Sequence, residues 1–155
     1  MNPRIQIMLD SRQLEESPAA EGEVEGMWRK AVRTWGSSTV AGLDPDARFT
    51  LAYQAAFQAA TAVTRAAGYQ VRGEAHHHHT FAAVAALSLG AVSDAARALN
   101  VIRQKRHGAI YDWETQLADE DVEEVRDAAW RLFAHGEAWL RPHHPKLVPL
   151  PASPP

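Results

Sequence analysis

Cysteine is absent from the 155 residues of this chain. Neither a disulfide framework nor a zinc site built on thiolates can therefore form within it. The first residues, Met1 to Arg4, are not followed by the long apolar core of a secretory signal peptide. A cytoplasmic location is the expectation that follows from these absences.

Long apolar runs and an excess of positive charge are missing as well. No apolar run approaches the roughly 20 residues that a membrane-spanning helix requires, because charged residues such as Arg65 and Arg97 interrupt every candidate. The formal net charge is -3 and the pI is near 6.2. Coating of nucleic acid without sequence preference draws on many Lys and Arg contacts to phosphate, so the composition argues against that class of protein. A local basic patch is still compatible with this composition.

What the chain does contain is a high proportion of alanine, and 46% of its residues are hydrophobic. Residues 55–67 include neither Gly nor Pro, which favours closely packed helices over a pleated sheet. The length suits one domain with its own core. The sequence therefore predicts an all-α protein.

Hydrophobic spacing and end signals divide this chain into three parts. Residues 1–20 are predicted to form an N-terminal arm or a short helix, and residues 21–141 a helical bundle. The predicted helices of the bundle cover residues 21–35, 44–68, about 77–89, 93 to about 111, and a last helix from 119. Asp44 and Asp119 are expected to cap their helices. Six prolines in residues 142–155 predict an extended, flexible tail.

A polar stripe on the helix predicted from residue 93 is the segment that could carry chemistry. At about 100° per residue, Arg103 and His107 lie roughly 40° apart. Asn100, Arg106 and Tyr111 fall within about 80° of Arg103 on the same wheel. The stripe borders the packing face of the helix, where a cleft or an interface is expected. Clustered cations repel one another there, and an anionic partner would offset that cost.

A plainer interpretation of the same residues stays open. Arg103, Lys105 and Arg106 could be solvated residues that meet the negative C-terminal end of their own helix. His107 could be a hydrogen-bonded packing residue, since histidines are often partly buried without a chemical role.

Four consecutive histidines, His76 to His79, invite a metal site. Consecutive residues of a helix point about 100° apart, so only His76 and His79 could converge on one ion. Glu74 is the nearest acidic residue, and further ligands would have to come from elsewhere. We therefore predict no metal site, and instead a capping and packing role for this run.

Two segments resemble the HEPN superfamily of small helical proteins, in particular its bacterial branches. The run Phe49 to Ala60 is similar to the long core helix of the family, and residues 103–112 carry the pattern Arg-x-x-Arg-His-x-x-x-Tyr-Asp. The resemblance covers residues 21–140. It implies an up-and-down bundle of four to five helices that commonly dimerises, with the two Arg/His segments facing each other in a cleft.

Many HEPN members are metal-independent ribonucleases, and many are toxins paired with a minimal nucleotidyltransferase antitoxin. The resemblance implies that His107 would be the acid/base and that Arg103 with Arg106 would clamp the phosphate. Asn100 and Tyr111 would orient the substrate, and Tyr111 is also the candidate for nucleotide attachment by the antitoxin. No cofactor is expected. A homodimer is the expected assembly.

The spacing of the motif supports a second function. Only residues 104–106 separate Arg103 from His107, whereas the active pattern of the family places four to six residues there. The related branch with Arg-x-x-Arg-Asn is not generally a nuclease. The alternative is therefore a noncatalytic nucleotide- or RNA-binding helical partner of a nucleotidyltransferase. A purely structural adaptor is a third interpretation.

Overall fold

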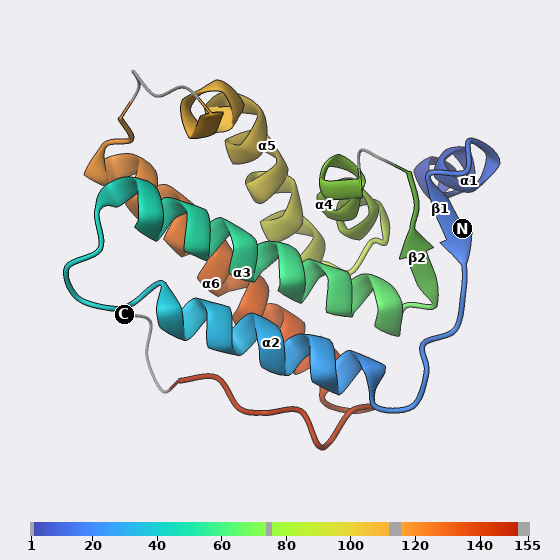
Figure 1. The fold of residues 1–155 in the computed structure, drawn as a ribbon. Helices are drawn as coiled ribbons and strands as arrows, with labels where there is room; N and C mark the ends of the chain where they lie inside the picture. Colours follow the sequence, from blue (N-terminus) through green and yellow to red (C-terminus); the bar gives the residue numbers. More distant parts are fainter. Residues whose placement is uncertain (1, 74–75, 112–115, 152–155) are drawn as a thin grey trace.

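A computed structural model describes residues 2–73, 76–111 and 116–151 of the chain; the side chains of residues 76–78 and 107–111 lie outside the description. Six helices and two short strands occupy these ranges (Figure 1). They are α1 (Pro3–Asp10), β1 (Leu14–Glu16), α2 (Glu23–Ser37), α3 (Pro45–Ala66), β2 (Tyr69–Val71), α4 (His76–Ala86), α5 (Ala91–Tyr111) and α6 (Asp119–Leu140). The mostly helical class is confirmed, with six helices and a small sheet in place of four to five helices. No helix in the described part of the chain is long and apolar enough to cross a membrane.

The two helix starts for which a cap is predicted differ in outcome. Asp44 caps α3, because its side chain accepts a hydrogen bond from the backbone N–H of Ala47 at 2.8 Å, and Pro45 follows at the first helical position. At α6 the prediction is wrong, since Ala118 takes the N-cap position and Asp119 lies in the first turn. The carboxylate of Asp121 reaches back to the Ala118 N–H at 2.9 Å and supplies the missing acceptor.

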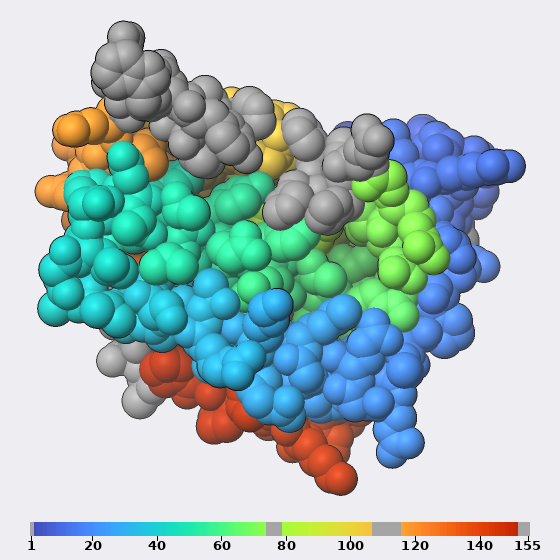
Figure 2. Space-filling view, viewed as in Figure 1, coloured from blue at the N-terminus to red at the C-terminus, as the bar shows by residue number. Residues whose placement is uncertain are grey.

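Alanines of α3 determine how closely the neighbouring helices approach it. Ala52, Ala55, Ala56, Ala59 and Ala60 are all fully buried. Side chains this small let α2 and α6 pack directly on α3, and Figure 2 shows α2 and α3 side by side on one face of the molecule. The large side chains of the core come from the helices around this alanine band.

Aromatic rings of α2 and α6 fill the core opposite α3. Trp28 meets Phe133 edge to face, with ring centroids 5.3 Å apart, and Trp35 lies 5.6 Å from Phe133. These contacts join the second helix to the last, which are separated by most of the chain.

The N-terminal segment docks on the bundle through a small second core. β1 pairs antiparallel with β2, and Leu14 stands opposite Val71. Ile5, Met8 and Leu14 are buried against alanines of α4. The expected short helix is present as α1. The strands were not predicted, because three residues are too few to show the alternation by which a strand is recognised.

The segment after α6 packs on the bundle as far as the structure describes it. Leu147 is only 3% exposed and belongs to the main core. His144 Nδ1 lies 2.6 Å from Glu25 Oε1 on α2. Residues 142–151 of the segment that was expected to be a flexible tail thus make packing and polar contacts with the bundle. Proline excludes helix there, but it does not prevent a leucine from entering the core or a histidine from pairing with another element.

Candidate functional site

The polar stripe lies on α5, which is unbroken from Ala91 to Tyr111. Its backbone therefore places His107 one turn after Arg103, as the sequence predicts. The structure brings Asn100 and Arg103 together, because the Arg103 Nε donates a hydrogen bond to Asn100 Oδ1 at 3.2 Å. Arg103 is 8% exposed, so the stripe does border the packing face.

Arg106 points to the start of α6. Its Nη2 lies 2.6 Å from Asp121 Oδ1, and both side chains are mostly covered. The other oxygen of the same carboxylate holds the Ala118 N–H. Beside this pair, Lys105 Nζ lies 3.3 Å from Glu124 Oε1 at the surface. Two of the cations that were expected to attract an anion thus already face carboxylates of α6.

These ion pairs change what the segment can do chemically. A guanidinium clamps a phosphate through N–H groups that are free to donate, and the carboxylate of Asp121 both occupies Arg106 and repels an approaching phosphate. The plainer interpretation places these residues in solvent, where they interact only with the dipole of their own helix. It does not include the ion pairs that Lys105 and Arg106 make with α6.

The remaining predicted site residues fall outside the described side chains. The roles of His107 as acid/base and of Tyr111 in orienting substrate stay predictions. The same holds for His76 to His78. His79 is half-buried, and its Nδ1 is buried without a hydrogen-bond partner. Among the side chains that the structure describes, no three His, Asp or Glu residues are grouped as metal ligands would be.

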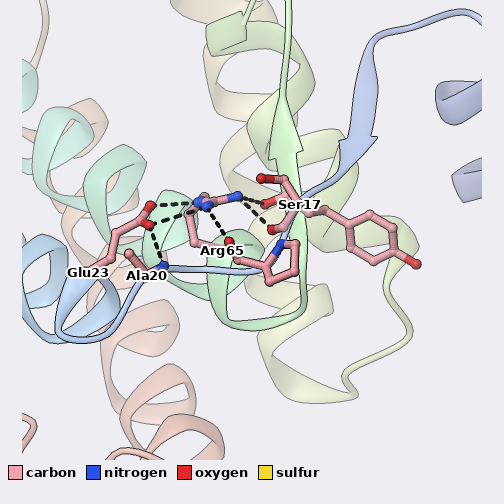
Figure 3. Close-up of polar contacts among 6 residues, drawn as sticks. Ser17, Ala20, Glu23 and Arg65 are labelled. Atoms are coloured by element: carbon pink, nitrogen blue, oxygen red, sulfur yellow. Dashed lines mark hydrogen bonds and ion pairs between the residues drawn. The ribbon is translucent and has the colours of Figure 1, made fainter.

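A buried arginine that the sequence analysis did not select holds α3 to the N-terminal segment (Figure 3). Arg65 donates to both carboxylate oxygens of Glu23, from Nε at 2.7 Å and from Nη2 at 3.2 Å. Its other hydrogen bonds go to the carbonyl oxygens of Ser17, Tyr69 and Pro18. All five N–H groups of the guanidinium donate hydrogen bonds within the protein. Arg65 therefore joins α3 to the N-terminal segment and has no donor left for a ligand. A signal for it existed, because Arg65 is the only charged residue between Phe49 and Ala66.

A second buried arginine joins α6 to the end of α2. Arg126 Nη1 donates to the carbonyl oxygen of Ser38 at 3.1 Å and contacts its hydroxyl at 3.0 Å. The guanidinium lies over the Trp35 ring, with Cζ 4.6 Å from the centroid. Burial lowers the pKa of Arg126, and repulsion from Arg48 lowers it further. Sequence reasoning missed this residue because nothing near it in the chain marks it as buried.

Comparison of the chain with family models, curated proteins and solved structures found no significant match.

Proposed function

We propose that the protein is a noncatalytic HEPN-like helical partner of a nucleotidyltransferase. The contact surface is the α5–α6 face, which we define as Lys105, Arg106, Asp121 and Glu124. The observation that carries this proposal is the 2.6 Å ion pair between Arg106 and Asp121. It commits the arginine that a ribonuclease would need for the phosphate.

The charges of the α5–α6 face suit a protein partner better than a polyanion. Cations and carboxylates alternate across it, and the side chains of Lys105 and Glu124 are 50% and 41% exposed. The first turn of α6 adds the acidic residues Asp119 and Glu120. Mixed charges of this kind fix the orientation of a protein partner, whereas RNA phosphates would meet repulsion from every carboxylate.

A metal-independent ribonuclease is the second candidate, and one observation favours it. Arg103 is buried and its guanidinium is oriented by Asn100, on the same unbroken helix that carries His107 one turn later. In this function His107 would move the proton of the ribose hydroxyl, and Arg103 would stabilise the phosphate.

Incubation with RNA in the presence of a chelator separates the two candidates. The noncatalytic function predicts that the wild-type protein and His107→Ala leave the RNA equally intact over hours. Cleavage by the wild type that is lost in His107→Ala would overturn it in favour of the ribonuclease. A preparation repurified by a second column excludes a contaminating nuclease as the source.

The first test of the partner is whether a minimal nucleotidyltransferase is encoded beside the gene. Such a protein is then co-expressed with this chain, and the mixture is analysed by size-exclusion chromatography with light scattering. A stable complex is expected, and Glu124→Lys should weaken it by about tenfold because it reverses a charge at the contact. The control is Glu21→Lys, the same change at an exposed residue before α2. Equal binding by both variants, or no complex with the wild type, would contradict the proposal. The light scattering of the free protein also checks the expected homodimer.

A further inference from the structure

A cavity of about 280 Å³ is lined by residues of α2, α3, α4 and β2. Met27, Phe57 and Val71 form its apolar walls, and each of these side chains is half-buried. The volume is close to the lower end of the roughly 300–1,000 Å³ that is typical of small-molecule sites. A ligand of one-ring size therefore suits the cavity.

Two threonine hydroxyls on the α3 wall of the cavity act as acceptors. Thr61 Oγ1 donates to the carbonyl oxygen of Phe57 at 2.9 Å, and Thr64 Oγ1 donates to that of Ala60 at 2.8 Å. A hydroxyl that has donated its only hydrogen can still accept a hydrogen bond. A ligand that satisfies these oxygens must therefore contain N–H or O–H donors.

Gln70 lines the cavity from β2 and adds an amide to it. Its side-chain amide makes no hydrogen bond with any residue that the structure describes. A glutamine amide has donors on its nitrogen and an acceptor on its oxygen. The group that pairs with both of them at once is another amide.

The ion pair between Glu23 and Arg65 forms part of the cavity wall and determines which charge a ligand can have. Every N–H group of the Arg65 guanidinium already donates within the protein, so no donor remains for an anion. The Glu23 carboxylate would repel an anion, and the Arg65 guanidinium would repel a cation. A neutral ligand avoids both repulsions.

We propose that this cavity is a binding site for a small neutral aromatic amide. The amide group pairs with Gln70 and donates to the threonine hydroxyls, and the ring packs against Met27 and Phe57, since thioether and aromatic groups both make favourable contacts with rings. No residue of the α5–α6 face lines the cavity, so the site goes beyond the proposed function and does not depend on it.

Thermal unfolding and calorimetric titration of the full chain test the site with benzamide, benzoate, benzylamine and toluene. These probes share one ring and differ in charge and in hydrogen-bonding groups. Benzamide should raise the Tm of the wild type in a saturable way, and each of the others should bind at least about tenfold more weakly. Equal binding of benzoate or benzylamine overturns the neutral class, and equal binding of toluene overturns the amide. A cavity that holds only water binds none of the probes, which overturns the whole proposal.

Gln70→Leu keeps the approximate size of the side chain and removes its amide. The substitution should weaken the binding of benzamide by about tenfold and leave that of toluene unchanged, a difference that a folding defect would not produce. Gln54→Leu is the matched control, because Gln54 is half-buried on α3 and does not line the cavity. Benzamide binding that persists in Gln70→Leu, or equal weakening in Gln54→Leu, contradicts the assignment of the amide contact.

Thr61→Phe places a ring inside the cavity and should abolish the binding of benzamide. The control is Thr34→Phe on α2, because Thr34 Oγ1 makes the same kind of hydrogen bond, to the carbonyl oxygen of Lys30 at 3.1 Å, and Thr34 does not line the cavity. Benzamide should bind this control as it binds the wild type. Binding that survives in Thr61→Phe would place the ligand elsewhere and overturn the proposal.

Discussion

Arg106 and Asp121 join α5 to the first turn of α6, with Nη2 2.6 Å from Oδ1. The same carboxylate accepts the backbone N–H of Ala118 through its other oxygen. The Asp121 side chain thus caps the start of α6 and also neutralises Arg106 of the polar stripe. This double use is the reason that the stripe is better suited to a structural contact or a partner than to clamping phosphate.

Removal of the Asp121 side chain is expected to lower the stability of the fold more than removal of the Asp119 side chain. Asp121→Ala should lower the free energy of unfolding by about 1 to 2 kcal/mol, since both the capping acceptor and the ion pair are lost. Asp121→Asn should cost less, because an amide oxygen can still accept the Ala118 N–H. Urea denaturation measures both. Asp119→Ala is the control and should have little effect, since Asp119 is exposed.

The cluster around Arg65 should be among the most sensitive polar sites of the chain. Glu23→Ala leaves a buried guanidinium without its carboxylate, and the expected loss of stability is about 3 kcal/mol. Glu15→Ala breaks the exposed Arg72 pair instead and should cost under about 1 kcal/mol. Equal losses in the two variants, measured by chemical denaturation, would show that the Arg65 cluster is not sealed from water.

Acid should weaken the fold through two carboxylates on α2. A hydrogen bond from Arg65 holds the pKa of Glu23 below its ordinary value, and a hydrogen bond from His144 does the same for Glu25. A lowered folded-state pKa contributes stability above the unfolded-state pKa and loses it as the pH falls through the folded-state pKa.

We therefore expect the urea midpoint to fall as the pH drops below about 4.5. The fall should be shallower in Glu23→Gln and in Glu25→Gln than in the wild type, because each variant removes one of the titrating groups. Parallel curves for the wild type and both variants would contradict this account.

Leu147 tests whether the segment after α6 belongs to the core. Leu147→Ala should cost about 2 to 3 kcal/mol, the cost of deleting a large buried side chain. Val40→Ala, at an exposed hydrophobic position, should be nearly neutral. Limited proteolysis adds a second measurement, since cleavage within residues 142–151 should be slow in the wild type and faster in Leu147→Ala.

Gly136 offers a stabilising substitution. It lies inside α6, where an added Cβ would be 3.4 Å from the Trp28 ring, an ordinary contact distance. Gly136→Ala should raise the free energy of unfolding by up to about 1 kcal/mol, because alanine has the higher helix propensity. A thermal melt measures the shift. A fall in Tm would mean that the Trp28 ring cannot accommodate the methyl group.

Local signals in the chain account for much of the helical framework. Apolar spacing and the Asp44-Pro45 start predicted α3, and Gly68 follows its end as expected. The same reasoning placed Asn100, Arg103 and Arg106 on one helix. These predictions hold because helix geometry depends on residues three and four positions apart, which the sequence displays directly.

Helical spacing does not predict which group each buried arginine contacts. Glu23 and Arg65 are 42 residues apart, and Ser38 and Arg126 are 88 apart. Each contact exists only after α2, α3 and α6 have packed, so no local pattern reports it.

The sequence by itself determined that this chain forms packed helices and that one of them carries a polar stripe. Only the tertiary structure decided that Arg106 faces Asp121, and that Arg126 donates to Ser38 and lies over the Trp35 ring. Periodicity determines which face of a helix a side chain occupies. The group that the side chain contacts depends on which other helix packs against that face.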